Sequence, residues 1–124
     1  MAFEQDVDTI TVPASADLSA SQYCFMYVNS SGQLAASSAG GKMAGVLQDK
    51  PSAAAAPGAL GYEGVTKVRA GGTCTKGAYA ASDSTGRAVD AVSGDIAGGI
   101  FLSGTTAAND IVSMILMPQL GKVW

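Results

Sequence analysis

The 124-residue sequence contains no histidine. Histidine is the commonest general base of enzymes and the commonest side-chain ligand of transition metals, so this absence removes the usual routes to catalysis and metal binding. Asp6 and Asp8 would share one side of a strand, but no other carboxylate cluster accompanies them. The stretch GGKM at residues 40–43 resembles the end of a phosphate-binding loop, yet Ala36 stands where its first glycine is required. The sequence therefore predicts a protein that is not an enzyme and has no catalytic, metal or cofactor site.

Cysteine and charged residues are also scarce. Cys24 and Cys74 are too few for a disulfide-stapled scaffold, and we expect two reduced, half-buried thiols, with a disulfide as the alternative. Charged residues make up only 14% of the chain and the net charge is -3, which argues against nucleic acid as a partner because phosphate binding needs clustered Lys and Arg. With 48% apolar residues, part of the surface is expected to be covered by another protein.

Long apolar runs are missing as well. No window approaches the roughly 20 apolar residues that a membrane-spanning helix needs. The beginning of the chain, MAFEQDVDTI, is acidic where a secretory signal would be basic and apolar. We therefore expect a soluble protein that is made in a cytoplasm and has no membrane partner.

What the sequence does contain is glycine, 16 residues of it, and short apolar runs without a helical stripe. Turn-forming residues interrupt these runs about every 8 to 14 positions, a spacing typical of all-β barrels and sandwiches. The predicted strands are residues 10–12, 23–28, 43–47, 65–68, 96–102 and 111–117. The last of these, and residues 23–28, are apolar on both faces, so each is either central in the core or covered by another subunit.

Two stretches of the chain repeat each other. NSSGQLAASSAGGKMAGVL begins at Asn29, and DSTGRAVDAVSGDIAGGIF begins at Asp83, which is 54 positions later (83 − 29). In each, Asn or Asp opens a turn and the fourth residue, Gly32 or Gly86, supplies a positive φ for a bulged hairpin. We predict a small β-barrel or sandwich built from two pseudo-repeated four-stranded halves, at about 22–69 and 76–117, within one domain over 13–124. Matching the fourth strands, PGALGYEG and NDIVSMIL, requires a two-residue contraction.

Candidate contact residues lie at both ends of the chain. Residues 1–12 form a polar segment with scattered apolar side chains, which we interpret as an extended N-terminal arm. For residues 9–12 we favour the first strand of the barrel, which leaves residues 3–8 as the arm. The terminal Trp is either frayed or docked on a neighbour. The predicted interface residues are Phe3, Val7, Ile10, Val12 and Trp124.

Several motifs in order resemble the capsid decoration, or cement, proteins of tailed bacteriophages, over roughly residues 16–116. The motifs are GVLQDKP (45–51), G-x-TKVRAGG (64–72), TKGAYAASDSTGRAV (75–89) and GGIFL (98–102). The resemblance implies a small β-barrel on the outer capsid surface of the virion, which binds as a homotrimer, uses residues 1–12 for contact and stabilises the shell by bridging major capsid protein subunits. The alternative is a head-fibre base or adaptor, or a host-surface-binding module on the virion.

Overall fold

The computed structural model is an all-β protein, as the sequence predicted. It describes the backbone of residues 5–122 and the side chains of residues 7–117. Within that part of the chain no helix is long and apolar enough to cross a membrane. The strands are β1 Gln5–Pro13, β2 Phe25–Val28, β3 Leu34–Ala36, β4 Gly45–Leu47, β5 Pro57–Arg69, β6 Tyr79–Ser82, β7 Ala88–Asp90, β8 Ile96–Phe101 and β9 Ile111–Lys122.

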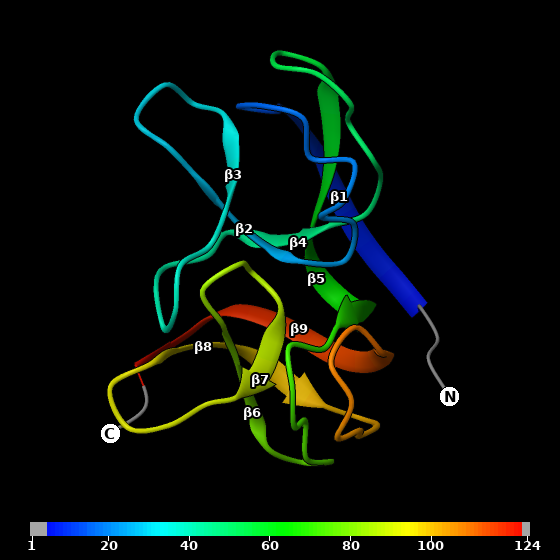
Figure 1. Cartoon of the computed structure of the whole chain (residues 1–124), viewed down its shortest axis with the longest axis vertical. Helices are drawn as coiled ribbons and strands as arrows, with labels where there is room; N and C mark the ends of the chain where they lie inside the picture. The colour runs from blue at the N-terminus through cyan, green and yellow to red at the C-terminus, as the bar shows by residue number, and fades with distance from the viewer. Residues whose placement is uncertain (1–4, 123–124) are drawn as a thin grey trace.

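The strands form one curled antiparallel sheet in the order β3-β2-β4-β5-β9-β8-β6-β7, and β1 pairs with β5 beside this path. Figure 1 shows two halves stacked along the long axis. We call β1 to β4 with the beginning of β5 the upper half, and the end of β5 with β6 to β9 the lower half. Strand β5 belongs to both, because its first residues pair with β1 and β4 whereas residues 64–69 pair with β9.

The two halves repeat the same pairings with a constant shift along the chain. Met26 pairs with Ala36 in the upper half, and Ala80 pairs with Asp90 in the lower half, so both partners move by 54 positions (26 to 80 and 36 to 90). The hairpins of the two halves are therefore equivalent residue by residue.

The shift of 54 continues into the fourth strand. Leu47 pairs with Leu60, and Phe101 pairs with Met114, again 54 positions on (47 to 101 and 60 to 114). The two-residue contraction predicted for this strand is therefore wrong. The two-residue difference between the halves lies earlier in the repeat, before β2 and β6. The bridge Ala14–Leu34 recurs as Ala70–Ala88, a shift of 56 on one side (14 to 70) and 54 on the other (34 to 88). The connector that follows this first position is therefore two residues shorter in the lower half.

Each half curls around a core of its own, and those two parallel bridges bring β3 and β7 back to the ends of the long strands. The side chains at equivalent core positions differ in size but compensate one another. Leu34 of the upper core corresponds to the smaller Ala88, while Leu47 corresponds to the larger Phe101. Two cores of different composition thus fill the same backbone arrangement. The upper core consists of Ala14, Leu18, Cys24, Met26, Leu34, Leu47 and Leu60.

The halves meet at a waist where the upper half contributes side chains to the lower core. Phe25 of β2, Met43 of the segment between β3 and β4, and Val46 of β4 all pack in the lower core. Backbone hydrogen bonds cross the same boundary: the N–H of Phe25 donates to the carbonyl of Gly86 at 2.6 Å, and that of Gly40 to Ser82 at 2.9 Å. The two halves therefore form one packed body.

The two strands predicted to be covered on both faces are covered within the chain itself except at their ends, where Val28 is 40% and Met117 is 37% exposed. In β2, Phe25 is buried in the lower core and Met26 in the upper core. Strand β9 lies between β5 and β8, which confirms the central alternative for residues 111–117. One boundary differs from the expectation: β2 begins at Phe25, because Tyr23 has a left-handed backbone with φ 66° and cannot continue a strand.

Candidate functional site

The segment predicted as an N-terminal arm is, from Gln5 onward, strand β1 paired with β5. Val7 and Val12 are half-buried, and Val12 packs against the upper core, whereas Ile10 is 50% exposed. Among the described strands β1 pairs with β5 alone, so its other edge presents free backbone donors and acceptors. An open edge next to an exposed Ile10 is a surface suited to a neighbouring chain. The predicted contact residues Phe3 and Trp124 lie outside the described residues.

The turn glycines occupy equivalent positions but have different surroundings. Gly32 has φ 75° and Gly86 has φ 88°, and each lies in a turn in which a side-chain oxygen of Asn29 or Asp83 accepts two backbone N–H groups. An added Cβ at Gly32 would meet nothing within 4 Å, whereas one at Gly86 would lie 2.8 Å from the carbonyl oxygen of Phe25. The lower turn is therefore docked at the waist and the upper turn is open.

The lower half carries an apolar surface equivalent to the one that the upper half buries. Phe25 pairs with Val46, and 54 positions later Tyr79 pairs with Ile100 (25 to 79 and 46 to 100). Phe25 is fully buried at the waist, but the equivalent Tyr79 is 51% exposed, since the described residues include no further repeat unit that packs against it. We call this surface, which carries Tyr79 and Ile100, the open end. The same half has a second exposed apolar side chain, Val92, which is 64% exposed in the connector between β7 and β8.

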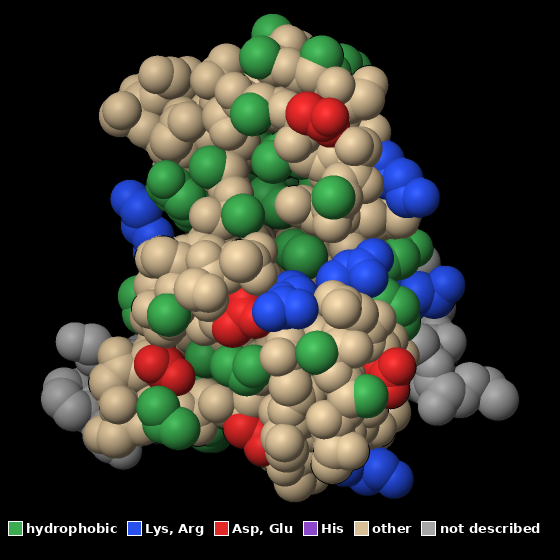
Figure 2. Space-filling view, viewed as in Figure 1, with side chains coloured by type: hydrophobic (Ala, Val, Ile, Leu, Met, Phe, Trp, Pro, Cys, Tyr) green, Lys and Arg blue, Asp and Glu red, His purple; other side chains and the backbone are tan. Residues whose placement is uncertain are grey.

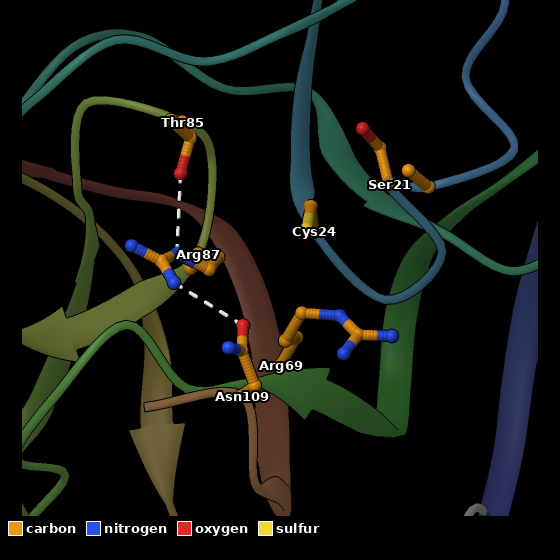
Figure 3. Close-up of a pocket in the computed structure, with 7 residues that line it drawn as sticks. Ser21, Cys24, Arg69, Thr85, Arg87 and Asn109 are labelled. Carbon is orange, nitrogen blue, oxygen red and sulfur yellow. Dashed lines mark hydrogen bonds between the residues drawn. The ribbon is translucent and has the colours of Figure 1, made fainter. Parts of the chain in front are cut away.

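A pocket of about 350 Å³ lies at the waist between the halves. Figure 2 shows Lys and Arg side chains gathered near the middle of this face of the molecule, with an acidic side chain beside them. Figure 3 shows Arg69 at the end of β5, Arg87 and Thr85 beside the β6–β7 turn, and Ser21 and Cys24 on the upper half. The pocket is lined by Ala20, Ser21, Cys24, Arg69, Thr85, Arg87 and Asn109.

The two arginines of this waist pocket are held differently. Arg87 donates from Nε to Asp83 Oδ2 at 3.0 Å and from Nη1 to Asn109 Oδ1 at 3.1 Å. The backbone N–H of Arg69 donates to the carbonyl of Tyr23 at 2.8 Å, which fixes the residue against the upper half. The buried Nε of Arg69, however, has no hydrogen-bond partner among the described residues.

The two cysteine thiols are protonated and weakly reactive. Cys24 and Cys74 are both free and buried. Burial raises the pKa of the Cys24 thiol, and the opposing influence of the nearby Arg69 is smaller. Burial also raises the pKa of Cys74, to about 12. Both side chains are therefore neutral at pH 7, and Cys24 supplies a wall of the waist pocket rather than a nucleophile.

Sequence reasoning missed this pocket because its residues are far apart in the chain. Arg69 falls within TKVRAGG, and Thr85 and Arg87 fall within TKGAYAASDSTGRAV, but these motifs give no sign that the three residues meet. Arg69, Arg87 and Asn109 come together only when the end of β5 meets the β6–β7 turn and the segment before β9. The repeat offered one sign of a charged site in the lower half, because Arg87 stands at the position equivalent to the neutral Gln33. Within the described part of the chain, no cluster of His, Cys, Asp and Glu is arranged to bind a metal ion.

Neither a family model nor a curated protein matches this sequence. The fold, however, resembles a phage head-fibre base. The N base of the head fibre protein gp8.5 of bacteriophage phi29 superimposes with a TM-score of 0.73 and 11% sequence identity, over 95% of this chain and 98% of that one. At this identity the likeness establishes a shared fold across nearly the whole chain.

Proposed function

We propose that this protein is a structural component of a bacteriophage virion that attaches to the outer surface of the capsid. The observation that carries the proposal is the match of 95% of the chain to a head-fibre base. The motif resemblance to capsid decoration proteins points to the same surface of the same kind of particle. The free edge of β1 and the open end supply surfaces for such attachment.

In its finer form the proposal is a cement function. A homotrimer that bridges major capsid protein subunits binds only the assembled shell, and therefore shifts the equilibrium away from separated subunits. Three weak contacts act together, because after the first subunit has bound the others meet their sites at high effective concentration. Avidity of this kind exceeds single-site affinity by about 10²-fold or more.

We place the capsid contact on β1. Its free edge can accept a strand of a partner through backbone hydrogen bonds, while the exposed Ile10 offers an apolar side chain that the partner can bury. Removing residues 1–12 would not test the contact alone, since it would also remove one of the strands that pair with the long β5. A charged side chain at Ile10 tests the contact and leaves the pairing of β1 with β5 in place.

A head-fibre base or adaptor is the second candidate, and the structural match favours it specifically. Both candidates attach to the capsid, but they differ in number and in what they carry. A cement protein covers the shell stoichiometrically, whereas a fibre base holds a second structure above the shell. Counting copies per virion by quantitative gel and looking for a fibre by cryo-electron microscopy distinguishes the two.

The attachment itself is tested by sedimenting the purified protein with empty, expanded capsids, with light scattering to measure the mass of the free oligomer. We expect wild type to sediment with the capsids and Ile10→Lys to remain largely in the supernatant. Val28→Lys is the matched control, since Val28 is a 40% exposed apolar residue at the end of β2 in the same half. Wild-type protein that ignores capsids at saturating concentration overturns the proposed function, and normal binding by Ile10→Lys overturns the assignment of the contact to β1.

A further inference from the structure

The waist pocket is cationic in a protein that is acidic as a whole. None of the residues that line it is acidic, and two of them are arginines. Asp83 neutralises Arg87 through their 3.0 Å ion pair, whereas no carboxylate of the described residues forms an ion pair with Arg69. Ser21 and Asn109 add a hydroxyl and an amide donor to the lining, whereas the hydroxyl of Thr85 already donates to Asp83. The pocket therefore presents a positive charge surrounded by hydrogen-bond donors.

Arg69 carries the strongest indication of a missing partner. Its Nε is buried and donates no hydrogen bond to the described residues, although a guanidinium group normally satisfies such a donor when it is taken out of water. The side chain of Arg69 interacts with the thiol of Cys24, but sulfur is a weaker acceptor than oxygen and this contact leaves the Nε unpaired. Arg69 lines the pocket, and its backbone is held by the hydrogen bond to Tyr23, so an acceptor that enters the pocket meets a guanidinium group that is anchored at its base.

The barrel itself does not require these polar side chains. In the upper half the positions equivalent to Arg87 and Asn109 are Gln33 and Ala55. Ala55 and Asn109 share the same left-handed backbone, with φ 67° and 71°, so the turn is built with or without the amide that holds Arg87. The charged pocket is therefore an addition to the repeated fold and not a consequence of it.

We propose that the waist pocket binds a carboxylate group, with Arg69 as the principal contact. The planar fork of a guanidinium matches the two oxygens of a carboxylate, and the Asp83–Arg87 pair shows that carboxylate geometry is already used beside this pocket. A volume of about 350 Å³ accommodates a small organic acid or one acidic side chain. Because the lining comes from both halves, an occupant would tie the upper half to the lower half. The carboxylate is supplied either by a free acid or by a protein segment.

The test is a titration followed by amide and arginine side-chain NMR signals, using succinate, a short blocked peptide containing one glutamate, and inorganic phosphate as probes. We expect saturable shifts centred on Cys24, Arg69 and Arg87 with succinate or the peptide, and with an affinity in the millimolar range or tighter. Binding of the peptide alone indicates a protein-borne carboxylate, and binding of both indicates a site open to free acids. Arg69→Gln should weaken binding at least about tenfold, and Arg69→Lys should fall between that variant and wild type.

Lys76→Gln is the matched charge control, because Lys76 is exposed and lies outside the lining; it should change the affinity less than about twofold. Signals away from the pocket report whether each variant remains folded, and the wild-type titration stands without any variant. The proposal is overturned if no carboxylate probe gives saturable shifts, if phosphate alone binds, or if Arg69→Gln and Lys76→Gln weaken binding equally.

Discussion

Gly32→Ala and Gly86→Ala change the same left-handed backbone conformation, once in an open turn and once in a turn docked at the waist, so their effects on the free energy of unfolding can be compared. Both residues have positive φ, 75° and 88°, so alanine costs about 1–2 kcal/mol at either position for the left-handed backbone alone. At Gly32 the added Cβ would have open space around it. At Gly86 it would lie 2.8 Å from the carbonyl oxygen of Phe25 and 3.4 Å from the Cβ of Cys24. The first distance is too short for a real Cβ contact, and backbone on both sides makes it difficult to relieve.

We therefore expect Gly86→Ala to lower the free energy of unfolding by about 1–3 kcal/mol more than Gly32→Ala. The β6–β7 turn has to move away from the waist, and the 2.6 Å hydrogen bond from the N–H of Phe25 to Gly86 is lost, which leaves a buried donor unpaired. Urea unfolding at one fixed protein concentration measures both variants, with the slope checked against wild type. Equal losses in the two variants would refute the conclusion that the docked turn contributes to holding the halves together.

Three further predictions follow from the local surroundings of single residues. Ala55→Gly should stabilise the fold by about 0.5–1 kcal/mol, because Ala55 has φ 67°, whereas the neighbouring Ala54→Gly should destabilise it by a similar amount; thermal unfolding measures both. Phe25→Ala should cost about 3–5 kcal/mol and the equivalent Tyr79→Ala much less, since only the first side chain is fully buried; chemical denaturation tests this order, which equal losses would contradict. The folded-state pKa of Cys74 is raised from 9.0 to about 12, so its unfolded form loses the proton first, and the thiol's contribution to stability is present below pH 9 and is lost as the pH rises toward 12. Stability measured against pH should therefore fall less steeply over this range in Cys74→Ala than in wild type.

Features that depend on neighbouring residues were predictable from the sequence. Turns such as NSSG and DSTG have a local cause, an Asn or Asp side chain at the first position and a glycine with positive φ at the fourth, and the structure contains both. The all-β fold followed from the spacing of such turns. The register of the fourth strand was not predictable, because the connectors consist mostly of Ala, Ser and Gly, whose side chains do not distinguish one alignment from the next. The pairings of Leu60 and Met114 with their partners fix it in the structure.

The waist pocket could not be predicted from the sequence, for a different physical reason. A guanidinium on one strand gives no local sign of what will lie opposite it. Arg69 follows an alternating run and reads as a solvated charge, and only the stacking of the halves buries its Nε beside the upper half. The same stacking explains the burial of Phe25 and the exposure of Tyr79, two aromatic residues at equivalent positions.

Two equivalent units stacked end to end always leave one unmatched surface at each end, because the contact that joins them is used only once. In this chain the lower half covers the surface of the upper half that carries Phe25. The equivalent surface of the lower half is the open end, which carries Tyr79. A tyrosine suits a surface that is wet in one state and covered in another, since its ring packs while its hydroxyl finds a polar partner. The open end is therefore expected to be covered when the protein is attached to a capsid or holds a further protein. Tyrosine-selective chemical labelling should modify Tyr79 in the free protein and spare it on decorated capsids, and equal labelling in both states would show that this surface takes no part in assembly.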